Sequence, residues 1–167
     1  PSTDDISKSL SSVINMLNTK YIIRKGQSGD LIASQNPSRY GPAWLVKEVK
    51  VVANADEEMN LLSTFDLSNK ALVDQRFGLS TTSYSAIGTI LLSSYEPNHL
   101  VYDVNVDEAS FAVFSEIFYD KGWNAYINGE LNQHYRVNYV LRGMNLPKGE
   151  YQVEFKFEPQ SVALGSS

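Results

Sequence analysis

The chain has 167 residues, of which 43% are hydrophobic and 20% are charged, with a formal net charge of −5 and no cysteine. This length fits one domain that buries a core without disulfides, and the missing cysteines exclude disulfide frameworks, thiolate zinc sites and cysteine nucleophiles. The acidic balance argues against a nucleic-acid-binding surface, which needs clustered lysine and arginine, so we expect no nucleic-acid partner.

No stretch of the sequence predicts a membrane span or a signal peptide. A membrane-crossing helix needs ~20 apolar residues, whereas the longest uncharged run, 77–95, contains eight serines or threonines and two glycines. Residues 1–5 have neither a basic start nor an apolar core. Because the first residue is not methionine, we expect the chain to be a fragment or a processed product.

The first part of the chain predicts one helix and short strands. Apolar residues recur at helical spacing over 6–17 and predict an amphipathic helix with a stripe of Ile6, Leu10, Val13, Ile14 and Leu17. A short strand follows at 21–23. Residues 25–42 contain three glycines and two prolines, which predicts a loop. Residues 43–53 predict a strand with a bulge or bend near Lys47-Glu48.

A second helix has a clear start signal. Asn54 is a good N-cap and Glu57 follows three residues later, close to a capping box. The acidic run 56–58 opposes the positive end of the helix dipole, which explains it better than acid/base chemistry does. The expected buried face comprises Met59, Leu62 and Phe65.

From Lys70 onward the pattern is that of strands joined by short turns. The expected strands are 71–77, 87–95, 99–106, 109–119, 123–128, 134–142 and 150–157. Residues 110–119 are apolar on both faces, as in a central strand covered from both sides. The expected fold class is therefore α+β: an antiparallel, jelly-roll-like β-sandwich with two N-terminal helices. We divide it into a helical and mixed segment 1–69, the sandwich 70–160, and a tail 161–167.

Residues that carry common catalytic chemistry do not form a known motif. The two histidines, His99 and His134, are not accompanied by a G-x-S-x-G elbow, and no glycine-rich phosphate loop occurs. Asp103, Asp107 and Glu108 are close enough along the chain to offer oxygen ligands to calcium, but a solvated acidic turn explains them better. We therefore expect no catalytic residue, no metal and no cofactor.

Aromatic residues crowd the stretch from 119 to 139. Trp123, Tyr126, Tyr119 and Tyr139 lie there among several asparagines. Flat rings stack on the apolar face of a sugar and amides bind its hydroxyl groups, so this group is a candidate carbohydrate-binding surface. The alternative is that the rings serve core and cross-strand packing, because strands favour aromatic residues in general.

Two charged residues complete the candidate site. Arg142, directly before Gly143, points to solvent or forms a buried bidentate pair with a carboxylate such as Glu116, and we favour a structural pair over substrate binding. Both residues nevertheless join the candidate carbohydrate site. Glycoside hydrolysis needs two carboxylates ~5–9.5 Å apart across a cleft, and Glu116 with Glu130 is the pair to test.

Several motifs together suggest a family. The most specific are VFSEIFYDKGWNAYING at 113–129, NYVLRGM at 138–144, LPKGEY at 146–151 and VEFKFEP at 153–159, with weaker ones at 16–23 and 43–46. In these motifs the chain resembles the C-terminal extracytoplasmic domain of the YfhO family of bacterial multi-pass membrane proteins. The resemblance covers nearly the whole chain, with 24–42 and 78–88 as variable loops.

The resemblance implies a polytopic protein similar to membrane glycosyltransferases that use a lipid-linked sugar donor and modify cell-surface polymers such as teichoic acids. In that family the catalytic acidic residues are expected in a loop near the N-terminal membrane helices. No position here matches that loop, so no catalytic residue is carried over. The family also continues past the Glu158-Pro159 motif into a last membrane helix, which fits a chain cut before that helix.

We therefore predict an accessory domain on the extracytoplasmic face of the bacterial cell membrane, in a glycosyltransferase-like protein. It binds acceptor glycan or lipid-linked sugar, with Trp123, Tyr126 and Tyr119 as stacking candidates, and its partner is the membrane-embedded remainder of the same protein. One alternative is a docking module without sugar affinity, which an exposed apolar patch without a groove would favour. The other is a stand-alone glycan hydrolase, which needs a second carboxylate with a raised pKa beside Glu116 or Glu130.

Overall fold

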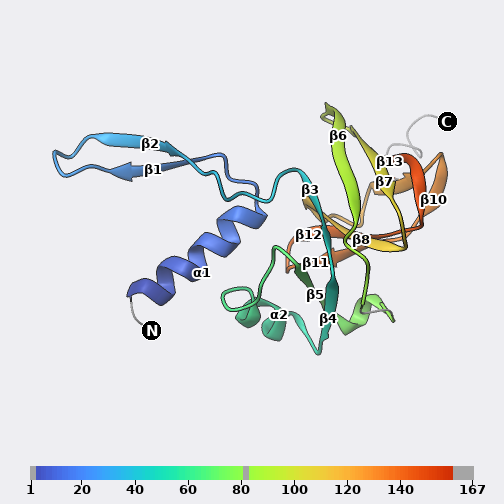
Figure 1. Cartoon of the computed structure of the whole chain (residues 1–167), viewed down its shortest axis with the longest axis horizontal. Helices are drawn as coiled ribbons and strands as arrows, with labels where there is room; N and C mark the ends of the chain where they lie inside the picture. The colour runs from blue at the N-terminus through green and yellow to red at the C-terminus, as the bar shows by residue number, and fades with distance from the viewer. Residues whose placement is uncertain (1–2, 81–82, 160–167) are drawn as a thin grey trace.

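The computed structural model describes residues 3–80 and 83–159, and their side chains from residue 10 onward (Figure 1). The predicted tail 161–167 and the side chain of Ile6 lie outside this described part. The elements in chain order are α1 (Thr3–Met16), β1 (Tyr21–Lys25), β2 (Leu31–Gln35), β3 (Ala43–Val46), β4 (Glu48–Val52), α2 (Ala55–Leu61), β5 (Lys70–Asp74), the 3-10 helix η1 (Gln75–Phe77), β6 (Gly88–Glu96), β7 (His99–Val106), β8 (Ser110–Ile117), β9 (Trp123–Ile127), β10 (Glu130–Asn132), β11 (His134–Val137), β12 (Leu141–Leu146) and β13 (Gly149–Phe157).

The strands of the described residues form two larger antiparallel sheets and two strand pairs. The five-stranded sheet has the order β10-β9-β13-β7-β6, and the four-stranded sheet has the order β11-β12-β8-β3. β1 and β2 pair antiparallel, whereas β4 and β5 run parallel. β3 comes from the first 69 residues, yet it lies beside β8 in the four-stranded sheet. The predicted mostly β chain with two helices and antiparallel sheets is confirmed.

β8 is covered on both faces, as the sequence predicts. Its first five residues are buried. On one face, the ring of Phe114 lies 4.9 Å from that of Tyr102 and 4.8 Å from that of Phe155, both in the five-stranded sheet. On the other face, Phe111 joins a cluster with Leu72 of β5. The four-stranded sheet therefore lies between two hydrophobic cores.

Residues 134–142 are not the single strand that the sequence predicts, because a tight turn separates β11 from β12. Asn138 and Tyr139 have positive φ angles of 49° and 71°, a conformation that asparagine tolerates better than most residues. Asn138 is fully buried. Its backbone N–H donates to the carbonyl of Leu72, and its side-chain oxygen accepts from the Leu72 N–H, both at 2.9 Å. The turn thus bonds to β5 as a neighbouring strand would.

Other element boundaries agree with the predictions in some places and differ in others. Residues 43–53 break at Lys47 into β3 and β4, so the bend predicted there is confirmed. The predicted strand 71–77 ends at Asp74 and continues as η1. The Asn128-Gly129 turn joins β9 to β10 with φ angles of 49° and 85°, as a two-residue hairpin requires. β10 itself was not predicted.

The start of α2 is confirmed, but its buried face is only partly so. The Oδ1 of Asn54 accepts from the Glu57 N–H at 3.0 Å, and the Glu57 carboxylate accepts from the Ala53 N–H at 2.8 Å. Met59, predicted to be buried, is 46% exposed, whereas Glu58 is 0% exposed. The helix therefore turns a carboxylate, not a methionine, toward the protein interior.

The predicted loop 25–42 was wrong in part, because it contains β2. β2 pairs with β1 in a hairpin that extends away from the two sheets together with α1 (Figure 1). The predicted apolar stripe of the first helix is only partly buried: Leu10 is 60% exposed and Leu17 is 40% exposed, whereas Val13 packs against the core that contains Met16. This part of the molecule therefore presents apolar side chains that do not enter either core.

Candidate functional site

Arg142 of β12 is buried between the two larger sheets. It is 2% exposed, and its Nε donates to the carbonyl oxygen of Ile117 at 3.0 Å. The guanidinium carbon lies 4.3 Å from the ring centroid of Trp123 and 5.0 Å from that of Phe155. Aromatic faces this close stabilise a cation that has lost its water. The guanidinium of Arg142 therefore packs against aromatic rings, whereas the sequence analysis favoured a bidentate pair with a carboxylate.

Three buried polar atoms near Phe155 have no hydrogen-bond partner among the described residues: Nη1 of Arg142, the hydroxyl of Tyr102 and Nε2 of His134. The ring centroids of Tyr102 and His134 lie 6.1 and 5.7 Å from that of Phe155. The three groups thus surround one ring. A buried donor or acceptor without a partner costs about 1–3 kcal/mol, so a cluster of them is a candidate place for a hydrogen-bonding ligand.

Glu116 of β8 is the acidic group of this region. It is half-buried, and burial raises its pKa while the charge of Arg142 opposes the rise. Burial in turn lowers the pKa of Arg142, and Glu116 opposes that shift. Within the described structure the two side chains form neither an ion pair nor a hydrogen bond with each other. The bidentate pair favoured from the sequence is therefore not formed, although the predicted burial of Arg142 is correct.

We call these six residues the Arg142 site: Tyr102, Glu116, Trp123, His134, Arg142 and Phe155. Burial, with the charge of Arg142, lowers the pKa of His134 to about 4, so its ring is neutral at pH 7. Burial raises the pKa of Tyr102, whose hydroxyl stays protonated. Tyr95, which is 65% exposed, also acts on the pKa of both Tyr102 and Arg142. The site offers donors, acceptors and ring faces, which suits recognition of hydroxyl groups.

The other three predicted aromatic residues lie elsewhere. Tyr126 lies three residues after Trp123 in β9, so it faces the opposite side of the sheet. There its hydroxyl donates to Glu158 at 2.6 Å. Tyr119 follows β8 and is 49% exposed. Tyr139 lies in the turn between β11 and β12. Of the six predicted residues, the structure brings together three: Glu116, Trp123 and Arg142.

The carboxylate pair that a glycan hydrolase needs is not found at this site. Glu130 is exposed at the start of β10 in the five-stranded sheet, whereas Glu116 lies in the four-stranded sheet. No second carboxylate contributes to the raised pKa of Glu116. Within residues 3–80 and 83–159, no group of three or more histidine, aspartate or glutamate residues is placed to hold a metal ion.

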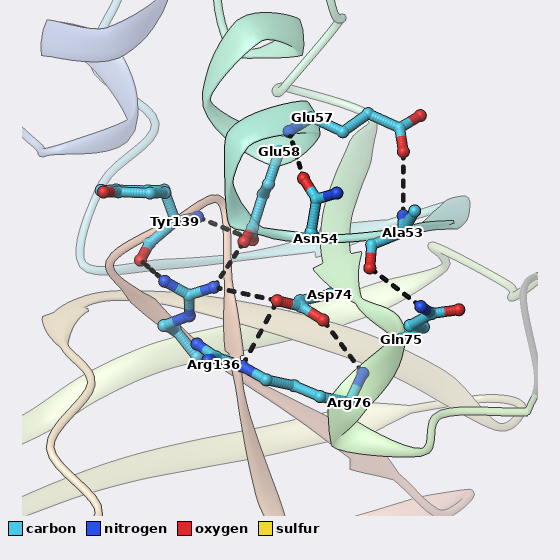
Figure 2. A network of polar contacts seen from close by, with 9 residues as sticks. All are labelled: Ala53, Asn54, Glu57, Glu58, Asp74, Gln75, Arg76, Arg136 and Tyr139. Carbon is cyan, nitrogen blue, oxygen red and sulfur yellow. Dashed lines mark hydrogen bonds and ion pairs between the residues drawn. The ribbon is translucent and has the colours of Figure 1, made fainter.

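A second buried polar cluster joins α2 to β5 and β11 (Figure 2). Glu58 accepts from Nη2 of Arg136 at 2.7 Å and from the backbone N–H of Tyr139 at 2.8 Å. Arg136 also donates to the Tyr139 carbonyl at 2.8 Å and lies 3.8 Å from Asp74. Asp74 in turn contacts Nε of Arg76 at 3.3 Å. We call these five residues the Glu58 network.

The charges of the Glu58 network balance, with two carboxylates and two guanidinium groups. Burial raises the pKa of Glu58, while the Tyr139 N–H and the charge of Arg136 oppose that rise. Figure 2 shows that the carboxylates of Glu58 in α2 and Asp74 in β5 both point toward Arg136 in β11. The network therefore fixes α2 and β5 against the β11–β12 turn and has a structural role.

Comparison with known families gives one match. The family described as "Bacterial membrane protein YfhO" matches residues 62–167. The chain belongs to the YfhO family. This confirms the resemblance seen in the sequence, and the matched segment contains every residue of the Arg142 site. No curated protein and no solved structure matches this YfhO-family chain. Across the described ranges, none of its helices has the length and apolar character needed to cross a bilayer.

Sequence reasoning missed several residues that matter in this YfhO-family domain. Glu58 lies four residues before Leu62, which places both on one helical face, so the spacing already indicated that Glu58 is buried. Tyr102 alternates with Leu100 and Val104 in β7, which indicated its inward direction. The unpaired state of His134 had no such signal, because it depends on how the two sheets meet.

Proposed function

We propose that this domain binds an acceptor glycan or a lipid-linked sugar on the extracytoplasmic face of the membrane, as an accessory domain of a glycosyltransferase-like YfhO protein. The observation that carries the proposal is the Arg142 site, where an aromatic ring, a carboxylate and unpaired buried donors lie together. The partner is the membrane-embedded remainder of the same protein, in keeping with the membrane-protein family. We also propose that the two larger sheets together form a jelly-roll-like sandwich, to which segment 1–69 contributes β3.

Each group has a role in this proposal. The half-buried Trp123 ring contacts the sugar, Nη1 of Arg142 donates to a hydroxyl oxygen, and Glu116 accepts from a hydroxyl group. The exposed ring of Tyr119 is a candidate for a further contact. Tyr126 belongs to a separate surface with Asn124, because both bond to Glu158 on the outer face of the five-stranded sheet.

Titration with purified cell-surface polysaccharide tests the proposal. Glu116→Gln is expected to weaken binding about tenfold, since a hydrogen bond to a charged group contributes about 1.5–3 kcal/mol. Trp123→Ala is expected to remove binding. Glu130→Gln is the matched control, because it makes the same change at an exposed position of the other sheet. Circular dichroism confirms that each variant is folded. A folded wild-type chain that binds no glycan, or a Glu116→Gln variant that binds as wild type does, would contradict the proposal.

A docking module without sugar affinity is the second candidate function. The exposed apolar side chains of β1 and β2 favour it, since they are clustered and belong to neither core. The two candidates use different parts of the molecule, so glycan titration and a docking assay separate them.

A further inference from the structure

The β1–β2 hairpin has one uncovered apolar face. Alternate residues of a strand point to the same side, and the pairing places Ile23 opposite Ala33 and Lys25 opposite Leu31. Tyr21, Ile23 and Leu31 are therefore on one side, and they are 56%, 66% and 76% exposed. We call this side the outer face of the hairpin.

The opposite side of the hairpin is directed toward α1. A cavity of about 300 Å³ lies between them, and its lining includes Ile14, Ile22, Arg24 and Ser34. The base of the hairpin is fixed to α1, because Nδ2 of Asn36 donates to Oδ1 of Asn15 at 2.9 Å and to the carbonyl of Thr19 at 3.0 Å. These two hydrogen bonds of Asn36 therefore keep the outer face of the hairpin directed away from α1.

The hairpin carries a positive charge on an acidic protein. Segment 20–36 contains three cations, Lys20, Arg24 and Lys25, and one carboxylate, Asp30, so its net charge is 3 − 1 = +2, against −5 for the whole chain. Nζ of Lys20 lies 5.5 Å from the ring centroid of Tyr21. In the part of the chain that is described, none of the three cations forms an ion pair. Lys25 therefore lies on the outer face opposite Leu31, and Lys20 reaches the other end of that face through its contact with the Tyr21 ring.

We propose that the outer face of the β1–β2 hairpin binds the surface of an anionic lipid bilayer. Ile23 and Leu31 enter the boundary between headgroups and acyl chains, and the ring of Tyr21 lies at headgroup level, where aromatic residues are enriched. The stems of Lys20 and Lys25 lie along the apolar surface while their ammonium groups reach lipid phosphates. The family to which the chain belongs is described as a bacterial membrane protein, which is in keeping with a lipid bilayer close to this domain. This proposal is independent of glycan binding at the Arg142 site.

Vesicle flotation with the 167-residue chain tests this inference. The chain is expected to float with phosphatidylglycerol vesicles and not with phosphatidylcholine vesicles, and the binding is expected to weaken as salt rises. Ile23→Ser with Leu31→Ser should reduce partitioning at least about tenfold, because two apolar side chains no longer leave water. Leu91→Ser with Leu131→Ser is the matched control, since these leucines are 65% and 68% exposed elsewhere.

A charge variant tests the electrostatic part. Lys20→Glu with Lys25→Glu is expected to reduce partitioning at least about tenfold, since each basic residue near an anionic surface contributes about 1 kcal/mol. Lys121→Glu with Lys148→Glu makes the same change in charge at exposed positions away from the hairpin and is expected to retain most of the binding. Equal loss in the hairpin and control variants would overturn the proposal. Absence of vesicle binding would also overturn it, and self-association that Ile23→Ser with Leu31→Ser abolishes would then assign the face to a second copy.

Discussion

Replacing Glu58 with alanine is expected to lower the free energy of unfolding by about 3–5 kcal/mol, because it leaves a buried guanidinium without its main partner. Glu58 is 0% exposed and Arg136 is 14% exposed at their side chains. The substitution also removes the hydrogen bond from the Tyr139 N–H to the Glu58 carboxylate, which stabilises Tyr139 at its positive φ angle of 71°. Urea-induced unfolding followed by circular dichroism measures the effect.

Asp56→Ala is the matched control for this substitution. It removes an acidic residue from the same first turn of α2, but the Asp56 side chain is exposed, so the expected loss is within about 1 kcal/mol. Glu58→Met combined with Arg136→Met should recover most of the stability lost in Glu58→Ala, since a buried ion pair is often replaceable by apolar residues of similar volume. Equal stability of the Glu58→Ala and Asp56→Ala variants would show that the network does not hold α2 in place.

Lowering the pH from 7 to 4 is expected to cost the fold about 3 kcal/mol through His134 alone, at 1.36 kcal/mol per unit of pKa difference. The pKa of His134 is about 4 in the folded chain, against 6.5 for an unperturbed imidazole. The unfolded chain therefore takes up a proton below pH 6.5 that the folded chain accepts only near pH 4. Because the unfolded state binds more protons in this window, stability falls as the pH falls through it.

The chain contains its own control for this effect, because it has two histidines. His134→Leu should flatten the loss of stability between pH 6.5 and pH 4. His99→Leu should keep most of that loss, although it removes the hydrogen bond that helps to lower the pKa of Glu154. The carboxyl groups of Glu58 and Glu116, whose pKa values are raised by burial, act in the opposite direction by losing stability as the pH rises. They are common to the wild type and the His134→Leu variant, so the difference between these two isolates His134. NMR titration of the imidazole resonances reports the pKa directly, and a value near 6.5 for His134 would contradict the prediction.

Local sequence patterns predicted the elements whose burial follows from alternation or capping. β13 alternates apolar and polar residues over its whole length, β8 is apolar on both faces, and Asn54 with Glu57 marks the start of α2; all three are confirmed. The division of 134–142 was not predictable in this way. It depends on Asn138, which bonds to Leu72 at a distance of 66 residues along the chain.

The candidate site shows the same difference between local and long-range information. The sequence left open whether Arg142 is exposed to solvent or buried. A carboxylate was favoured as its partner only because arginine and carboxylates form bidentate pairs. Its actual neighbours, Trp123 and Phe155, lie on two strands of the other sheet. The division of the chain at residues 69 and 70 stays a prediction, as do the roles of Tyr119 and Tyr126 in binding.

The position of β3 beside β8 sets a requirement on how much chain the fold needs. Trp44 is paired with Val113, so this edge of the four-stranded sheet closes only when segments almost seventy residues apart meet, which makes its formation slow relative to a local hairpin. The family match begins at residue 62. A protein shortened to the matched segment would therefore lack β3, and the longer strand β8 would become the edge of the four-stranded sheet, with its backbone groups available to other chains. The segment that the family model matches is therefore shorter than the segment that contributes strands to the four-stranded sheet.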